Sequence, residues 1–349
     1  MLLSETKTVA RVWPRSRSTP GLASGWEGVA WAELQTPLAS ARLRGLGDRL
    51  DAAFVRTGRR EYCSGMIGLS ARPVLAALIA KQDAAFAPRM RAVVSEWSRY
   101  LERSGLETDL MWGTTGALLC AAELETLCRG AVPKRVVDRL YVQTRDAARL
   151  ESRRCIKGEP AYIGLSHGIA GYLLALEVSH AVFGTRLSND FRGLLLEVIE
   201  EERYEVPGGG GLWPSTVGGP LGILGWCHGA PGVGLACLVG YALTNGREYR
   251  RLAKAALASS SAFPSSHHSF CCGAIGKAQV LVEGYRILGD RSYLRAARRA
   301  FREGAEGLKR SNRANHSFHG GTAGLRYLRQ RIDNPRLPLL GLGPLSVAS

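Results

Sequence analysis

The sequence is organised by a Gly-x-x-Gly turn that occurs six times and leads each time into a segment of helical length. The first glycines of successive copies are 44 to 61 residues apart. The copies are Gly65–Gly68, Gly113–Gly116, Gly168–Gly171, Gly229–Gly232, Gly273–Gly276 and Gly321–Gly324. Periods of this size are typical of arrays in which each repeated unit buries its apolar face against its neighbours.

Two kinds of helical segment alternate along these repeats. Segments that follow the turns, such as 117–127 and 233–243, are apolar on all sides, whereas the next ones, such as 136–151 and 293–308, have a charged face. A helix that is apolar all round must be buried, and an amphipathic helix covers it from outside. Regular strand alternation is absent. The sequence therefore predicts an all-α protein, an α/α toroid of six or seven helical hairpins with the Gly-x-x-Gly turns gathered at one end.

The domain organisation follows from where this pattern begins and ends. Residues 1–25 are rich in Arg, Ser, Thr and Pro, which is typical of a flexible N-terminal arm. Helical periodicity starts in the stretch 31–60, so we expect a single toroid domain over 26–335 and a C-terminal tail over 336–349. Glycines and prolines exclude a helix over 204–214. We interpret that stretch as a long connection. A mobile flap over a functional site is the alternative.

The chain is strongly basic, with 46 Lys and Arg against 30 Asp and Glu and a formal net charge of +16. Residues 286–336 alone hold 13 basic and 4 acidic side chains. This charge favours an acidic partner, and the alternative is a solvated basic surface without one. The basic residues lie on helices without interleaved aromatic residues, which argues against a nucleic-acid module. No run of 18 apolar residues occurs, so no membrane span is expected.

Eight cysteines are present, and the N-terminal stretch lacks the apolar segment of a secretory signal. We therefore expect a cytoplasmic protein, in which disulfides are rare. Cys120, Cys128 and Cys237 lie in apolar helical segments and are best explained as core residues.

Three other cysteines stand directly before two of the repeated turns: Cys227, Cys271 and Cys272. Zinc in proteins takes thiolate and imidazole ligands, and a catalytic zinc keeps three protein ligands and one open position. The repeat places all three thiols at the same end of the toroid. The sequence therefore predicts a Zn²⁺ site formed by these residues, and three buried thiols without a metal are the alternative.

Candidate acid–base residues stand before other turns at the same end. His167 precedes the third turn, and its imidazole can exchange a proton near neutral pH. Asp109, four residues before the second turn, can orient that imidazole, although a helix N-cap is an equally good interpretation. His228 lies beside Cys227 and is a second candidate acid, and the sequence does not decide between the two histidines. No role follows from the sequence for His267, His268 or His319.

The combination of Ser166-His167-Gly168, Trp226-Cys227-His228-Gly229-Ala230-Pro231-Gly232 and Cys271-Cys272-Gly273 with the recurring turns resembles the lanthionine synthetase C-like cyclases over residues 58–328. The resemblance implies a toroid with a zinc ion at its mouth. It also implies an enzyme that adds peptide cysteine thiols to dehydroalanine or dehydrobutyrine, which forms thioether rings.

Residue by residue, the resemblance matches Cys227 and Cys271 with zinc ligands, His167 with the acid–base histidine and Asp109 with its supporting carboxylate. Cys272 stands where the usual motif has histidine, as in some cyclase domains of class II lanthipeptide synthetases. His228 stands where some members have tyrosine. Ile223 and Leu224 occupy a region where the family often has a basic residue, so one contact to substrate is missing from the pattern.

The resemblance also implies partners. The substrate would be a dehydrated precursor peptide, whose leader segment is commonly acidic in the family. The chain contains no dehydratase region, so we expect a separate dehydratase. Two alternatives are a non-catalytic cyclase-like scaffold that binds modified peptides or partner enzymes, and a zinc-thiolate toroid of the prenyltransferase kind. The Cys-Cys-Gly pair and an aromatic content of 7% argue against the second alternative.

Overall fold

The computed structural model describes residues 26–56, 70–102, 106–221, 224–311 and 317–340. The expected arm over 1–25, the first turn at Gly65–Gly68 and residues 341–349 of the expected tail lie outside these ranges, as do Cys63 and Ile223.

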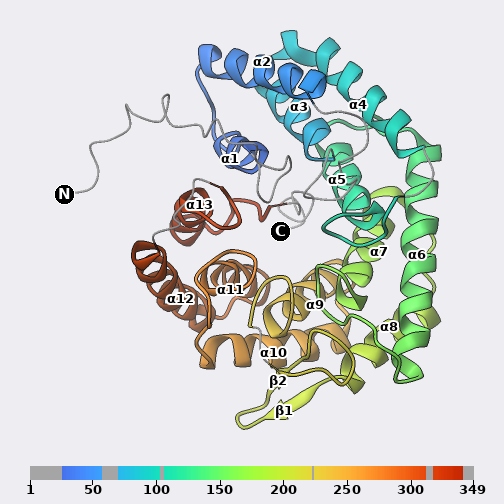
Figure 1. Cartoon of the computed structure of the whole chain (residues 1–349), viewed down its shortest axis with the longest axis vertical. Helices are drawn as coiled ribbons and strands as arrows, with labels where there is room; N and C mark the ends of the chain where they lie inside the picture. The colour runs from blue at the N-terminus through green and yellow to red at the C-terminus, as the bar shows by residue number, and fades with distance from the viewer. Residues whose placement is uncertain (1–25, 57–69, 103–105, 222–223, 312–316, 341–349) are drawn as a thin grey trace.

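Seven helices of the described chain form an inner ring around a common axis (Figure 1). Consecutive members pack against each other, and the first packs against the last, so the ring is closed. They are α1 (Trp26–Glu33), α3 (Ala71–Gln82), α5 (Thr114–Leu127), α7 (Ile169–Phe183), α9 (Ala230–Thr244), α11 (Ala274–Leu288) and α13 (Thr322–Asp333).

Six further helices of the described chain pack outside this ring, and a short 3₁₀ helix, η2 (Ala84–Phe86), precedes the second of them. They are α2 (Ser40–Arg56), α4 (Ala87–Leu101), α6 (Lys134–Ile156), α8 (Asn189–Glu201), α10 (Arg247–Ala262) and α12 (Arg291–Arg310). The α/α toroid predicted from the repeat is thereby confirmed.

Burial follows the two hydrophobic patterns in the sequence. In α7 every residue from Ile169 to Ser179 is buried, so this part of the helix has no solvent face. In α6 the buried residues instead recur at three- and four-residue steps, and most of the charged side chains lie on the exposed positions between them. The core therefore lies in two shells, one among the inner helices and one between the inner and outer helices.

Three details differ from the sequence-based expectations. The helical stretch 31–60 contains the end of α1 and all of α2, which are separated at Pro37. The inner helices α5, α7, α9, α11 and α13 begin directly after the first glycine of their turns, about three residues earlier than the apolar run suggests. The last inner helix, α13, is not wholly apolar, because its buried face includes Arg331.

The stretch 204–214 is not irregular. It forms an antiparallel hairpin of β1 (Tyr204–Val206) and β2 (Gly210–Leu212), the only strands of the described chain. Gly208 and Gly209 have φ of 87° and 76°, values that a residue with a side chain rarely adopts in a hairpin loop. The hairpin packs on α10, and the indole of the buried Trp213 donates a hydrogen bond to the Ile199 carbonyl at 2.6 Å.

None of the described helices has the length and hydrophobicity of a membrane-spanning segment.

Candidate functional site

The turns before α5, α7 and α11 share one backbone geometry. The residue after the first glycine donates its N–H to the carbonyl seven residues earlier, as Thr114 does to Glu107, Ile169 to Tyr162 and Ala274 to His267. The chain thus crosses closely over the start of each inner helix. Equivalent positions in different turns therefore occupy equivalent places around the axis.

Close approach explains both glycines of the repeat. A Cβ at the first glycine of the third turn would overlap the Tyr162 carbonyl, and a Cβ at the second would overlap the Leu165 carbonyl. The first glycine does not provide an unusual backbone angle, since φ at Gly168 is −133°, an extended value open to any residue. Gly229 differs, because its φ of 79° lies in the left-handed region that favours glycine.

Neighbouring turns are joined to each other by backbone hydrogen bonds. Leu110 donates to the Ser166 carbonyl at 3.1 Å, and Ser166 donates to the Cys227 carbonyl at 3.0 Å. The series continues from Cys227 to the Cys271 carbonyl at 3.0 Å and from Phe270 to the His319 carbonyl at 2.8 Å. This belt of turns fixes the candidate residues at one end of the toroid.

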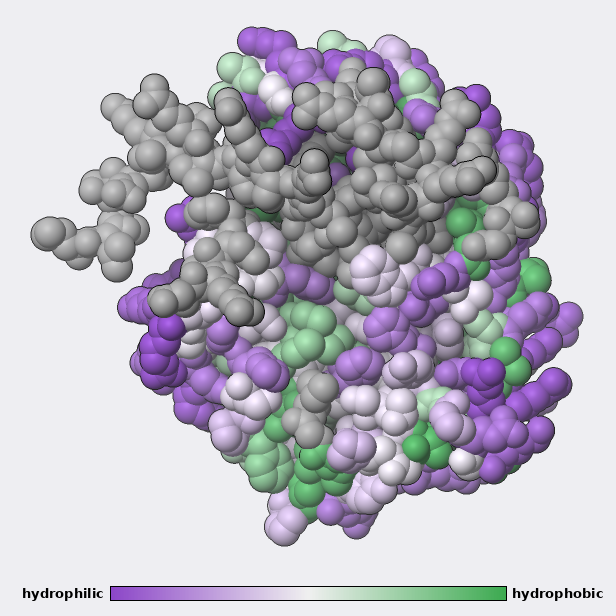
Figure 2. Space-filling model, in the orientation of Figure 1, coloured by the Kyte–Doolittle hydropathy of each residue, from purple (hydrophilic) through white to green (hydrophobic). Residues whose placement is uncertain are grey.

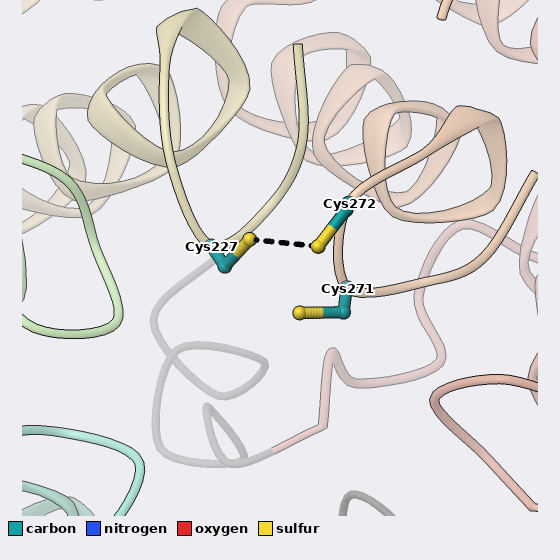
Figure 3. A group of neighbouring side chains, drawn as sticks. All are labelled: Cys227, Cys271 and Cys272. Carbon is teal, nitrogen blue, oxygen red and sulfur yellow. Dashed lines mark hydrogen bonds between the residues drawn. The ribbon is translucent and has the colours of Figure 1, made fainter. Parts of the chain in front are cut away.

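The three predicted thiols meet on this belt (Figure 3). The sulfur atoms of Cys227, Cys271 and Cys272 all lie within 4.8 Å of one another, and the Sγ atoms of Cys227 and Cys272 are 3.3 Å apart. Cys227 comes from the turn before α9, and the other two come from the turn before α11. No other group of His, Cys, Asp or Glu in the described chain offers such a cluster.

The geometry of this cluster fits a zinc ion. Tetrahedral Zn–S bonds of about 2.3 Å place pairs of sulfurs about 3.8 Å apart, a value within the range found here. Hydrogen bonds from Cys227 and Cys271 lower the pKa of Cys272 to about 3, and the contacts with Cys271 and Cys272 raise the pKa of Cys227. A dication would take the place of the remaining protons.

His167 and Asp109 also meet on the belt, although 58 residues separate them in the sequence. Nδ1 of His167 lies 2.9 Å from Oδ2 of Asp109. The other oxygen of Asp109 accepts the backbone N–H of Trp112 at 2.6 Å. Asp109 therefore does not cap α5, whose N-cap is Gly113. Its carboxylate stabilises the preceding turn and fixes Nδ1 of the imidazole, which leaves Nε2 available for proton exchange.

His228 lies next to this pair. The centre of its ring is 5.8 Å from that of His167 and 6.2 Å from that of Tyr162. Burial, together with the nearby His167, lowers the pKa of His228, so this ring favours the neutral form. Its Nδ1 is buried and has no hydrogen-bond partner in the described chain.

The three unassigned histidines lie around the turn of Cys271 and Cys272. His319 stacks on Phe270 at 4.9 Å between ring centres, and burial lowers the pKa of His319 to about 4. His268 packs against Gly307 of α12. His267 is exposed, and its carbonyl accepts the N–H of Ala274 at the start of α11.

Two aromatic residues of the site were missed from the sequence. Trp112 is 37% exposed and directly precedes the second turn, at the register position that His167, His228 and Cys272 hold in the next three turns. Tyr162 is 45% exposed and lies 5.8 Å from the His167 ring. It holds the register position of Glu107 and His267. Aligning the turns on their first glycines places both at positions that site residues hold in other turns, but it does not show that their rings are exposed.

The fold and the site together define a class of protein: an α/α toroid that carries a three-thiol cluster and a histidine–carboxylate pair at one end of its axis. The family profile described as "Lanthionine synthetase C-like protein" matches residues 67–337, and the chain belongs to this family.

A solved structure entitled "Nisin cyclase" is similar to the whole chain. The two share 14% sequence identity with a TM-score of 0.70, and the match covers 95% of this chain and 93% of the other. This similarity confirms the fold. No curated protein matches the sequence.

Proposed function

We propose that this protein is a zinc-dependent cyclase that adds cysteine thiols of a peptide to dehydroalanine or dehydrobutyrine residues and forms lanthionine or methyllanthionine rings. The observation that carries this proposal is the three-thiol cluster beside the His167–Asp109 pair, in a chain of the lanthionine synthetase C-like family. The similarity to a structure entitled "Nisin cyclase" is consistent with it.

Cys227, Cys271 and Cys272 would hold the zinc ion. When bound, zinc coordinates a substrate thiol and lowers its pKa, so that the thiol is deprotonated near neutral pH. Three protein thiolates place more negative charge at this centre than two thiolates and a histidine would. The substrate sulfur should therefore remain strongly nucleophilic.

The reaction is an addition in which no group leaves. The sulfur forms a bond to the β-carbon, the carbon–carbon double bond opens, and the electron pair moves to the α-carbon and its carbonyl. The α-carbon then needs one proton, which replaces the proton released by the thiol. We assign its delivery to Nε2 of His167, because Asp109 holds Nδ1 of this ring at 2.9 Å and stabilises its charged form. Among the described residues, no carboxylate lies in hydrogen-bond contact with His228.

The test uses a dehydrated peptide that contains cysteine. Ring closure leaves the peptide mass unchanged and removes thiols that an alkylating reagent would otherwise label, so mass spectrometry after alkylation reports it. We expect wild-type protein to contain one zinc ion and to remove these thiols. Cys227→Ala should lose both properties, whereas His167→Ala should keep the zinc ion and lose ring closure. Peptide binding with every thiol still labelled would refute the cyclase proposal and favour a non-catalytic scaffold.

The proposed partners are the dehydrated precursor peptide and a separate dehydratase that supplies it. The cytoplasm is the proposed location, because reducing conditions there keep thiols free, and all seven described cysteines are unpaired.

A basic stripe on α12 suits an acidic leader segment. It consists of Arg291, Arg295, Arg298, Arg302 and Lys309, which recur at helical spacing on one face and are all exposed. None of these five side chains forms an ion pair with another described residue. The outer edge of the molecule over α12 is hydrophilic (Figure 2). The stripe extends over about 27 Å at 1.5 Å per residue. Its C-terminal end lies near the candidate metal centre, since α12 packs at Gly307 on His268.

A further inference from the structure

Exposed aromatic side chains are few on the described surface, and two of them flank the His167–Asp109 pair. Trp112 follows Asp109 by three residues, and its N–H is bonded to that carboxylate. The ring of Tyr162 is 5.8 Å from that of His167. A large aromatic side chain that is exposed beside a reactive pair is a candidate contact for a ligand, because an aromatic residue that serves only the core is normally buried.

The backbone of Tyr162 is held on both sides. Its N–H donates to Oε1 of the buried Glu151 on α6 at 3.0 Å. Its carbonyl accepts the N–H of Ile169 at 3.1 Å, and the residue pairs with Thr216 in an isolated β-bridge. Exposure of this ring is therefore a property of a fixed backbone and not of a loose loop.

The rings of Tyr162, His167 and His228 form a triangle with centres 5.8 to 6.2 Å apart. Tyr162 is the most exposed of the three, because His228 is mostly buried and the side chain of His167 is 30% exposed. A group that rests on the accessible part of the Tyr162 ring is therefore a neighbour of His167.

We propose that Tyr162 contacts the acceptor residue of the substrate and determines specificity for it: the exposed ring packs flat against the planar dehydroamino acid and places its α-carbon beside His167. This inference rests on the proposed cyclase function. In dehydroalanine and dehydrobutyrine the α- and β-carbons are trigonal and conjugated with the carbonyl, so the residue is flat. Aromatic faces favour flat, polarisable groups. A saturated residue has a tetrahedral α-carbon and fits the face of Tyr162 less well. The same contact therefore weakens once the thioether ring of the peptide has closed.

The inference is tested by binding rather than by turnover. Isothermal titration calorimetry would compare two peptides in which serine replaces every cysteine, so that no ring forms. One contains dehydrobutyrine, and the other contains the saturated residue 2-aminobutyrate at the same position. We expect zinc-loaded wild-type protein to bind the first peptide about three- to tenfold more tightly, the size of one aromatic contact.

The variants identify the group that carries this preference. Tyr162→Ala should bind both peptides equally, whereas Tyr162→Phe should keep the preference because it keeps the ring. Tyr204→Ala is the matched control, since Tyr204 is 46% exposed and lies on the β1 hairpin away from the belt of turns. It should bind as the wild type does. Circular dichroism and zinc content should be unchanged in all three variants, because the contacts that hold Tyr162 are made by its backbone.

The results separate this inference from the proposed function. A wild-type protein without any preference, a preference that survives in Tyr162→Ala, or a preference lost in Tyr162→Phe would each overturn the inference. Ring closure by the wild type together with unchanged binding in Tyr162→Ala would support the cyclase and refute the role of Tyr162. If the binding preference depends on the aromatic ring of Tyr162 but the protein leaves the peptide thiols unreacted, the result would support the role of Tyr162 and refute the cyclase.

Discussion

Asp109 is bonded to two different groups, and a single substitution separates them. Asparagine would still accept the Trp112 N–H and keep the turn, but it would not stabilise a charged His167 or hold it in one tautomer. We expect Asp109→Asn to keep its zinc ion and to lower kcat by about 10²- to 10⁴-fold, the usual contribution of an acid–base group. Asp138→Asn is the control, since Asp138 pairs only with exposed Lys134, and its kcat should match the wild type. Equal kcat in both variants would contradict the assigned role.

Glu123 on α5 is a buried carboxyl group. It is 3% exposed, accepts a hydrogen bond from the Trp31 indole at 2.9 Å, and lines a cavity of about 370 Å³ with Leu34 and Leu78. Burial raises the pKa of Glu123 to about 7. Below pH 7 the protonated form is thus favoured in the folded protein, whereas in the unfolded chain the group titrates at about pH 4.3.

Glu123 should make the folded protein less stable as the pH rises. Below about pH 4 the group is protonated in both states and has no effect, and between about pH 4.3 and 7 folding becomes less favourable as pH rises. Above pH 7 the loss reaches about 3 kcal/mol. Glu123→Gln keeps the acceptor for Trp31 and does not titrate. About 1 kcal/mol of this loss has already occurred at pH 5, so we expect the unfolding free energies in urea at pH 5 and pH 8 to differ by roughly 2–3 kcal/mol less in this variant than in the wild type. Parallel pH profiles would show that Glu123 titrates normally.

Residue types explain which parts of the site could be predicted from the sequence. Cysteines, histidines and aspartate are chemically distinctive, and the repeat register indicated that Cys227, Cys271, Cys272, His167 and Asp109 share one end. Tyr162 was missed because an isolated tyrosine in an apolar context resembles a core residue, and sequence patterns do not report its exposure.

At the scale of the turn, Gly276 tests why the repeat needs glycine. An added Cβ would overlap the Phe270 carbonyl and approach Trp226. The turn that carries Cys271 and Cys272 would then have to move away from α11. We expect Gly276→Ala to lower the free energy of unfolding by about 1–3 kcal/mol and to weaken zinc binding.

Gly45 in α2 provides the matched control. A Cβ there meets nothing within 4 Å, and alanine is favoured over glycine in a helix by about 1 kcal/mol. Gly45→Ala should therefore be neutral or stabilising, with unchanged zinc affinity, in the same urea and zinc titrations. Similar losses in both variants would mean that the glycines act through helix propensity and not through close approach.

The basic stripe on α12 is tested by comparing positions at constant net charge. Replacing Arg295, Arg298 and Arg302 with glutamine should weaken binding of an acidic leader peptide roughly tenfold at low salt, and the remaining binding should depend less on salt. The control replaces the exposed Arg91, Arg129 and Arg153, which lie on other parts of the surface. Fluorescence anisotropy with a labelled acidic peptide measures both. An equal loss in the two triple variants would indicate attraction by net charge alone.

Helices were predictable because a 3.6-residue period recurs over many turns, whereas smaller elements depend on few residues. The break between α1 and α2 is only a short turn at Pro37, inside a stretch with continuous leucine spacing. The β1–β2 hairpin depends on the buried Trp213 and on two glycines in the left-handed region, within a stretch whose composition also suits an irregular loop.

Closure of the ring is a property of the whole molecule that local sequence does not reveal. Trp31 of α1 packs edge-on against Tyr327 of α13 at 5.3 Å between ring centres, across almost the full length of the chain. Arg331, fully buried on α13, bonds to Gln279 and Glu283 of α11 and to the Leu337 carbonyl. The Trp31–Tyr327 contact joins the two ends of the toroid and depends on a pair of residues that no repeat period relates, whereas Arg331 ties α13 to the neighbouring α11.

Zinc should stabilise the whole toroid, because its proposed ligands come from two neighbouring repeats whose turns are joined by backbone hydrogen bonds. A ligand that binds only the folded state adds about 4 kcal/mol to stability at a thousandfold excess over its Kd. We therefore expect a chelator to lower the melting temperature of the wild type. Cys227→Ala should melt at the lower temperature with or without zinc.

Cys237 distinguishes this effect from a general loss of packing. It lies on α9, ten residues after Cys227, and is fully buried in the core away from the cluster. Cys237→Ala should melt below the wild type and still lose further stability when zinc is removed, because its metal ligands are intact. If chelation shifts Cys227→Ala and Cys237→Ala equally, the stabilising zinc is bound elsewhere, and Cys227 belongs to the core rather than to the metal centre.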